Sequence, residues 1–251
     1  MVAAAALSAG AAGAQERPSS PGWQTRVGAG VVAGPRSIGA DKSRLRLVPS
    51  FDLRYGDWFF ANPIEGIGVQ SQTGAFSASA ALAPDLYGRD PDAGPRFRGL
   101  SRVSPTAAAR FRLGYAQDGY TASAVVSSRL GSSRRRGTTL QWEAGYDFVQ
   151  GPAMHFNAGL TLTAMDSTFA RNLLSVSAAE AAASGLPVYS AGSGMLDAGL
   201  YGQVLYRIDE RWSVFSRLQV SRLEGDAAKA PFVVKRTAPS FVVFVDYALA
   251  P

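Results

Sequence analysis

Residues 139–149 read Thr-Leu-Gln-Trp-Glu-Ala-Gly-Tyr-Asp-Phe-Val, and their side chains alternate between apolar and polar. A period of two is typical of a β-strand whose two faces meet different surroundings. The apolar face carries Leu140, Trp142, Ala144, Tyr146 and Phe148. The other face carries Gln141, Glu143, Gly145 and Asp147. Residues 153–164 repeat the pattern after a turn at 150–152, so the two segments predict an antiparallel hairpin.

The same alternation recurs from Trp23 to the end of the chain and predicts about twelve strands, or ten if the short segment 57–62 is not one. The expected strands are 23–33, 44–55, 57–62, 64–71, 74–83, 106–117, 120–130, 138–149, 153–164, 195–207, 211–223 and 239–249. Most have about ten residues or more, whereas strands of soluble proteins usually have five or six. This length matches the 9–11 residues that cross a bilayer at a tilt.

The predicted connections alternate between short and long. Tight turns fall at 55–57, 71–74, 117–119, 150–152 and 208–210, and long loops at 34–43, 84–105, 131–137, 165–194 and 224–238. The hairpin at Asn62 and Pro63 is the one short member of the second set. Short periplasmic turns and long extracellular loops are typical of bacterial outer-membrane proteins. The sequence therefore predicts a closed antiparallel transmembrane β-barrel in the outer membrane of a Gram-negative bacterium.

The polar strand faces are expected to line the inside of this barrel, because twelve strands enclose more space than apolar side chains readily fill. The charged residues predicted there are Arg44, Arg46, Asp52, Arg54, Arg110, Arg112, Glu143, Asp147, His155, Asp197, Arg207, Arg217 and Asp246. They would either favour anions in a channel or pair with one another inside a filled lumen. Aromatic residues near strand ends, such as Trp23 and Trp212, would suit an interfacial girdle.

Composition excludes several other classes of protein. The chain of 251 residues has no cysteine and one histidine, so it cannot form disulfides, Cys-ligated metal sites or multi-His sites, and we expect no cofactor. Its net charge is +6, but the arginines are spread along the chain, which argues against nucleic-acid binding. Arg134, Arg135 and Arg136 lie together in a predicted outer loop. They could bind lipopolysaccharide phosphates or simply form a solvated loop tip.

The N-terminal residues resemble a targeting segment. Residues 1–14 are apolar and end in Ala-Gly-Ala, as at a signal-peptide cleavage site, but no positive charge precedes them. We interpret them as a signal peptide truncated at its start, with an alanine-rich tail as the alternative. Residues 15–22 would be a linker, and residues 23–249 would form the barrel.

One pair of residues offers a catalytic alternative. A tight turn at 150–152 would put Asp147 directly across the hairpin from His155, with Glu143 one step further along the strand. A His and a carboxylate can activate a serine or a water molecule. No G-x-S-x-G motif is present, so a salt bridge is the preferred interpretation and we expect no enzyme. Residues 177–184 begin with Ser-x-x-Glu and predict a short capped helix in an outer loop.

Several longer stretches resemble the MipA/OmpV family of outer-membrane proteins, also described as MltA-interacting proteins. They are Gly-Ala-Gly-Val-Val-Ala-Gly-Pro at 28–35, Gly-Ala-Asp at 39–41 and the strand at 46–60. In the loop at 169–195, Ser-Val-Ser at 175–177, Glu180, Ser-Gly-Leu-Pro at 184–187 and Tyr-Ser-Ala-Gly at 189–192 are the most specific. Residues 223–231 resemble the family's L-x-G-D-A-x-x-S-P element, with Ala230 in place of serine.

This resemblance implies a pore-like barrel linked to cell-wall enzymes. Some members are described as scaffolds that join a lytic transglycosylase to a peptidoglycan synthase, and others as porins or adhesins. The resemblance therefore favours a scaffold for peptidoglycan-remodelling enzymes, with a narrow porin as the alternative. The chain departs from the family at its end, where Tyr247 is followed by Ala-Leu-Ala-Pro rather than by a terminal aromatic, and at Ile38, where an aromatic is usual.

Overall fold

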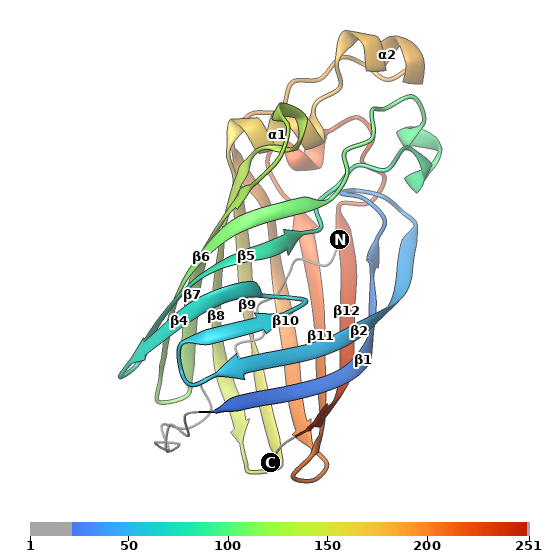
Figure 1. The fold of residues 1–251 in the computed structure, drawn as a ribbon. Helices are drawn as coiled ribbons and strands as arrows, with labels where there is room; N and C mark the ends of the chain where they lie inside the picture. Colours follow the sequence, from blue (N-terminus) through green and yellow to red (C-terminus); the bar gives the residue numbers. More distant parts are fainter. Residues whose placement is uncertain (1–21, 250–251) are drawn as a thin grey trace.

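A computed structural model describes residues 22–249 and shows one closed sheet of twelve antiparallel strands (Figure 1). The strands are β1 (Trp23–Pro35), β2 (Ser43–Tyr55), β3 (Phe59–Asn62), β4 (Gly66–Thr73), β5 (Phe76–Asp85), β6 (Thr106–Gln117), β7 (Tyr120–Arg129), β8 (Thr138–Gln150), β9 (Met154–Met165), β10 (Gly194–Arg207), β11 (Trp212–Leu223) and β12 (Thr237–Ala248). Neighbours in sequence pair with one another, and β1 pairs with β12 to close the barrel. The predicted fold class is thus confirmed, with twelve strands rather than ten.

The long connections gather at one end of the barrel and the short turns at the other (Figure 1). The long loops hold helices α1 (Ser167–Leu174) and α2 (Ala178–Ser184). They also hold 3₁₀ turns at Pro91–Ala93, Pro95–Phe97, Ser133–Arg135 and Ala227–Lys229. No helix in the described residues has the length and apolarity needed to cross a membrane. The predicted signal peptide at 1–14 and the linker at 15–22 lie, apart from Gly22, outside the described residues.

The alternation along each strand separates an apolar outer face from a largely polar interior. On β8, Trp142 is 39% exposed, whereas the side chain of the adjacent Glu143 is 10% exposed. On β9, Leu160 and Leu162 are exposed while Thr161 between them is 1% exposed. Because neighbouring residues of a strand point to opposite faces, the carboxylates face inward and the apolar side chains face the bilayer.

Aromatic side chains form a belt around the outer surface at the short-turn end. Trp23 contacts Tyr55 with ring centroids 5.2 Å apart, and Tyr120 contacts Tyr146 at 5.1 Å. On the neighbouring strands β11 and β12, Trp212 lies 4.9 Å from Tyr247. Aromatic rings of this kind favour the boundary between hydrocarbon and water, so this belt marks one membrane interface.

The interior is not polar throughout, which corrects the simplest form of the sequence prediction. Phe215, Val242 and Phe244 are buried together inside the barrel, and Val32, Val48, Ile64 and Leu205 pack against them. Phe244 can lie flat on the wall because Gly30 on the neighbouring strand has no side chain. One sector of the lumen is therefore apolar.

Candidate functional site: a lidded lumen

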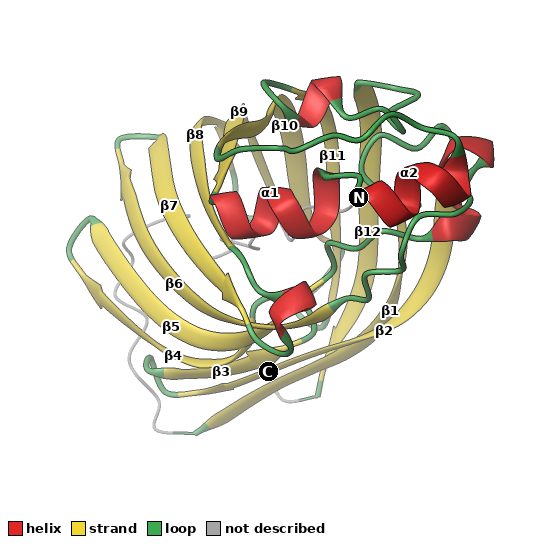
Figure 2. Ribbon diagram, turned by 90° about the horizontal axis from the view of Figure 1, so that it is seen from above, coloured by secondary structure: helices red, strands yellow, loops and turns green. Residues whose placement is uncertain are grey.

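Four outer loops pack together into a small hydrophobic core above the barrel. We call these loops, 36–42, 86–105, 166–193 and 224–236, the lid. Its buried apolar residues include Ile38, Phe97, Phe169, Leu173, Leu174, Val176 and Phe232. Seen from above, α1, α2 and the loops around them lie over the barrel end (Figure 2). Loops that share a core hold one another in place, since each buries apolar surface only while the others stay.

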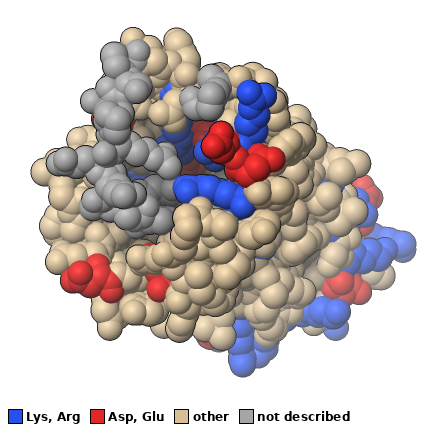
Figure 3. Space-filling model, turned by 90° about the horizontal axis from the view of Figure 1, so that it is seen from below, with Lys and Arg blue, Asp and Glu red and all other residues tan. Residues whose placement is uncertain are grey.

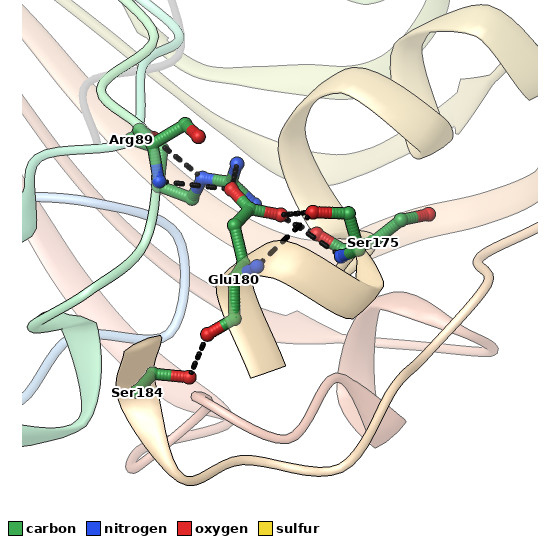
Figure 4. Close-up of polar contacts among 6 residues, drawn as sticks. Arg89, Ser175, Glu180 and Ser184 are labelled. Carbon is green, nitrogen blue, oxygen red and sulfur yellow. Dashed lines mark hydrogen bonds and ion pairs between the residues drawn. The ribbon is translucent and has the colours of Figure 1, made fainter. Parts of the chain in front are cut away.

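A buried ion pair joins two lid loops that are distant in sequence (Figure 4). Nη2 of Arg89 donates to Oε1 of Glu180, and the two side chains are only 5% and 9% exposed. Arg89 also donates from Nε to the carbonyl of Ser101 at 3.0 Å and from Nη1 to that of Ser175 at 2.7 Å. Every guanidinium nitrogen thus has a partner, which is the condition under which a buried charge is tolerated. We call this pair the latch.

Local sequence places Glu180 at this point. Ser177 caps α2 by accepting the Glu180 amide, and Glu180 in turn accepts the Ser177 amide at 2.9 Å. This is the reciprocal capping box expected from Ser-x-x-Glu, so the predicted helix is confirmed. Gly185 ends the helix with φ of 72°, a conformation that favours glycine.

The surroundings of Glu180 favour its charged form. Burial alone would raise its pKa, but hydrogen bonds from the amides of Ser177 and Ser101 and the charge of Arg89 outweigh burial. The pKa of Glu180 therefore lies below its ordinary value. Burial lowers the pKa of Arg89, and the Glu180 carboxylate opposes that effect. Both partners remain charged at neutral pH, because an arginine stays protonated far above it.

A second buried cation, Arg129, lies beneath the lid. The side chain of Arg129 on β7 is 0% exposed and lies 3.3 Å from Oδ1 of Asp85 on β5. Its Nη2 donates to the carbonyl of Tyr87 at 2.8 Å. Phe169 of α1 covers the guanidinium at 5.8 Å and stacks edge-on against Tyr87. These contacts tie the lid to the barrel wall over β5 and β7.

Further from the lid, side chains of β8 and β10 contact Arg217 of β11. Its Nη2 donates to Glu143 at 2.7 Å and its Nη1 to Gln203 at 3.0 Å. The guanidinium lies over the ring of Tyr201, 4.0 Å from the centroid. Gln219 continues the network to Thr161 on β9. All of these residues lie on the inward faces of four adjacent strands, so the network covers this sector of the inner wall.

His155 and Asp147 meet, but not in the predicted register. Asp147 pairs with Asn157, and His155 pairs with Gln150, because the register shifts between Asp147 and Val149. The prediction of a directly opposed pair was therefore wrong, although Nε2 of His155 still lies 3.0 Å from Oδ1 of Asp147. Asn157 also donates to that oxygen, at 2.6 Å. Among the described residues no hydroxyl group bonds to His155, and Glu143 pairs with Arg217 instead.

The other charged residues predicted inside the barrel do not form one site. Arg54 pairs with Asp52 at 3.1 Å, and Asp197 accepts from Thr163 at 3.1 Å. Elsewhere the partners are neutral groups, as for Arg110 with the carbonyl of Ile64, Arg207 with that of Pro152, and Asp246 with Ser50. Arg112 is half-buried on β6. Internal pairing thus accounts for many of these charges.

Arg44 and Arg46 on β2 behave differently from the rest. Both are exposed, and neither has a hydrogen-bond or ion-pair partner among the described residues. Arg135 and Arg136 are exposed at the tip of loop 130–137, where Nε of Arg136 donates to the carbonyl of Gly131. The side chain of Arg134 lies outside what the structure describes. No group of three or more His, Asp or Glu in residues 22–249 could hold a metal ion.

The short-turn end has a cavity of its own. It measures about 670 Å³ and lies between β1, the β8–β9 turn and the β10–β11 turn. Its lining includes Arg26, Arg207, Asp209, Glu210 and Arg211. Figure 3 views this end and shows basic and acidic side chains side by side near its middle. Nothing in the sequence predicted it, because the turns that form it are apart in the chain.

Sequence reasoning also missed the latch and the apolar sector. Glu180 was recognised only as a helix cap, and Arg89 stands in a loop without any pattern. Phe215, Val242 and Phe244 did carry a signal, because each is apolar on a strand face that is otherwise polar. Three breaks of alternation on adjacent strands indicate a patch that only strand pairing can assemble.

The family model for MltA-interacting protein MipA matches residues 27–249. The chain belongs to the MipA family. The fold and the family together make this MipA-family protein an outer-membrane β-barrel, as predicted. No protein of curated function matches the sequence.

Solved structures similar to this MipA-family barrel include OmpT of Vibrio cholerae, at 7% identity over 90% of this chain and 97% of that chain, with a TM-score of 0.40. The KdgM porin is 10% identical over 90% of this chain and 99% of that chain, with a TM-score of 0.42. The NanC porin is 8% identical over 89% and 98%, with a TM-score of 0.43. At this level of identity and superposition we draw no conclusion about function from them.

Proposed function

We propose that this barrel is a scaffold of the outer membrane that binds a peptidoglycan-remodelling enzyme at its short-turn end, and that it is not an open pore. The family's name, MltA-interacting protein, suggests a lytic transglycosylase as one partner and, by the resemblance above, a peptidoglycan synthase as another. The observation that carries the proposal is the lid, whose four loops share a core and are joined by the latch.

A barrel end that is covered by packed loops argues against a general diffusion channel. Residues directly beneath the lid are buried on several strands, with Ala83 of β5 2% exposed, Ala108 of β6 0% and Thr163 of β9 1%. Further from the lid, the network around Arg217 covers the inner wall over β8 to β11. A solute that entered along the axis would have to displace the lid and then pass the charged side chains around Arg217.

The short-turn end offers charges for a periplasmic partner. The connections 56–58, 74–75, 118–119, 151–153 and 208–211 hold Asp57, Asp118, Asp209, Glu210 and Arg211. Around the cavity there, Arg26, Arg207 and Arg211 add basic groups. A mixed-charge rim of this kind selects partners by electrostatic complementarity.

Two measurements test the scaffold role. First, the refolded barrel in planar bilayers should give no conductance steps. Second, the barrel in nanodiscs should bind a purified MltA-type lytic transglycosylase. The double variant Arg207→Ala/Arg211→Ala should weaken that binding by about tenfold or more, equivalent to about 1.4 kcal/mol. Lys229→Ala, in the lid, is the matched control and should bind like the wild type. Lack of binding by the wild-type barrel would contradict the scaffold role.

A narrow porin is the alternative, and the polar lumen favours it. Glu143, Gln203 and Arg217 would then border a constriction that opens when the lid moves. Reproducible steps from the wild-type barrel, with altered ion selectivity in Arg217→Gln, would support this alternative against a closed scaffold.

The outer loops support contact with lipopolysaccharide. Loops 36–42, 86–105, 130–137, 166–193 and 224–236 together hold thirteen Lys and Arg against seven Asp and Glu. Their excess of six equals the net charge of the whole chain, +6. The positive charge is therefore concentrated at the end where phosphates of lipopolysaccharide would lie.

A further inference from the structure

The barrel wall is incomplete on one side. β3 has only four residues, and it pairs with β2 only from Leu53 to Tyr55. Residues 43–52 of β2 consequently pair with β1 alone. Across the gap, residues 83–85 of β5 pair with β6 alone, because β4 starts at Gly66, and Ile67 already faces Leu82. Two strand edges thus face each other above the β3–β4 hairpin with no strand between them.

The gap has a defined frame, and we call it the lateral opening. Its floor is the hairpin turn at 63–65, where Asn62 accepts the amides of Ile64 and Glu65. Its top is formed by the lid, where Arg36 lies 3.2 Å from Asp90, and the Asp90 amide donates to Ser37. The lid therefore bounds the lateral opening at the top, and the hairpin turn bounds it below.

Exposure agrees with an opening at this place. Both faces of β2 are exposed over residues 43–47. At the lid end of the other long strands, the inward face is at least partly buried. Leu47, pointing outward, is 81% exposed. Arg44 and Arg46, pointing inward, are exposed as well, although residues beneath the lid on β5, β6 and β9 are buried.

Prolines mark the same edges. Pro49 lies in the part of β2 that lacks a second partner, and Pro84 in the corresponding part of β5. Proline cannot donate to a sheet ladder and is found on edges. Proline and inward-pointing charges also prevent another strand from adding to an edge. The edge is therefore protected against pairing with a second chain and suits an occupant that is not a strand.

The side chains around the lateral opening fit an anionic lipid, because apolar residues and arginines lie next to each other there. The pairing registers place five residues in one row on the inner wall. The row starts at the β2 edge and continues across β1, β12, β11 and β10 with Val48, Gly30, Phe244, Phe215 and Leu205. Val48 is only partly buried, so this apolar row is accessible at the edge. Val32 and Ile64, which are also partly buried, pack against the same apolar cluster. The next row toward the lid begins with Arg46. Arg44 and Arg36 carry like charges close enough to Arg46 to repel it.

From this juxtaposition we propose that the lateral opening binds an anionic lipid of the surrounding membrane. Its acyl chain lies on Val32, Val48 and Ile64, and its phosphate lies between Arg44 and Arg46. The arginines have no acidic partner among the described residues, so a phosphate would supply the missing counter-charge. Its oxygens and water at the same level can also bond to the open β2 edge, which lipid hydrocarbon alone could not do. This proposal does not depend on the scaffold role.

Single cysteines can test the proposal, because the chain has none of its own. Val48→Cys probes the apolar row, Leu47→Cys the lipid-facing neighbour, and Ser213→Cys the lumen near the short-turn end. Each variant is labelled with bimane and refolded into phosphatidylcholine vesicles. Increasing fractions of phosphatidylglycerol with a nitroxide on its acyl chain are then added. We expect quenching at 47 and 48 but not at 213.

Charge dependence separates binding from simple contact with the bilayer. The zwitterionic probe, nitroxide-labelled phosphatidylcholine, should bind more weakly than the anionic one. One basic residue near a lipid surface contributes about 1 kcal/mol. Half-quenching at position 48 should therefore need about fivefold more phosphatidylcholine probe than phosphatidylglycerol probe for each arginine that binds the phosphate. Arg44→Gln/Arg46→Gln should remove this preference, and the response at 47 should be the same for both lipids. Gel mobility with and without heating shows whether each labelled variant has folded. If the label at position 48 disturbs folding, Ile64→Cys provides the same measurement from a second position.

Three outcomes would overturn the proposal. One is no quenching at 48 and 64 while 47 is quenched. Another is quenching at 48 that depends neither on the lipid headgroup nor on the arginine substitutions. The third is disulfide-linked dimers of Leu45→Cys without quenching at 48, which would mean that a second copy covers the edge.

Discussion

At the scale of single residues, Glu180 joins two loops of the lid through its carboxylate. It accepts hydrogen bonds from Nη2 of Arg89, the amides of Ser101 and Ser177, and the Ser177 hydroxyl. Removing one partner of a buried ion pair leaves the other charge uncompensated, which typically costs about 3–5 kcal/mol. The latch therefore contributes to the lid chiefly because either half alone would be destabilising.

We accordingly expect Glu180→Gln to open the lid, with a loss of about 3–5 kcal/mol in its local stability. Hydrogen exchange of amides in 166–193 would measure this. Glu224→Gln is the matched control. Glu224 is half-exposed, and its carboxylate lies as far as 3.7 Å from the exposed Arg222, so this ion pair contributes little. Equal exchange in both variants would show that the latch does not hold the lid.

The depressed pKa of Glu180 predicts the pH dependence of the lid. A carboxyl whose pKa is lower in the folded state stabilises that state above its ordinary pKa of about 4.3. The contribution is lost as pH falls through the lower, folded value. The difference in lid stability between the wild type and Glu180→Gln should thus be constant from neutral pH to about 5 and shrink below about 4. A difference that shrinks near neutral pH would contradict the assigned direction.

At the scale of elements, the contact between β1 and β12 depends on a missing side chain. A Cβ atom on Gly30 would lie 2.1 Å from Cδ1 of Phe244 and 2.4 Å from the carbonyl oxygen of Val243. The ring could move, but the carbonyl belongs to the paired strand and cannot move without breaking the ladder. The seam that closes the barrel therefore tolerates only glycine here.

Gly30→Ala should consequently lower barrel stability, by about 1–3 kcal/mol as in other overpacked sites. The measurement is the urea concentration at which the heat-modifiable folded band disappears from gels. Ala29→Val, the adjacent residue on the lipid-facing side of β1, should leave that concentration nearly unchanged. If both variants unfold together, the close approach at Gly30 is not the cause.

At the scale of the whole molecule, charge is distributed along the barrel axis. The outer loops carry the net positive charge, while the short turns hold four acidic residues and one arginine. Apart from Arg89, the described basic residues of the outer loops are exposed. Because exposed charges are screened by salt, any attraction to lipopolysaccharide must weaken with ionic strength. The two sets of connections therefore carry opposite net charge.

Arg135→Gln/Arg136→Gln should weaken binding of purified lipopolysaccharide to the barrel and make it less sensitive to salt. The expected loss is about 1 kcal/mol for each arginine, or roughly fivefold. Titration of fluorescent lipopolysaccharide at two salt concentrations measures both effects. Arg207→Gln, at the opposite end, is the control, and an equal loss there would indicate only a general effect of net charge.

The sequence by itself determined the barrel, the strand boundaries to within about two residues, and the capped helix α2. Those features follow from periods of two, turn residues and a capping motif, all of which act over a few residues. Only the tertiary structure decided how the inside is arranged. Arg89 and Glu180, or Val48 and Phe244, are far apart in the chain, and their meeting depends on strand register and on loops packing against one another. The lateral opening lies between these two cases. Pro49 and Pro84 are visible in the sequence, but they mark an open edge only once the short β3 leaves both strands without a partner.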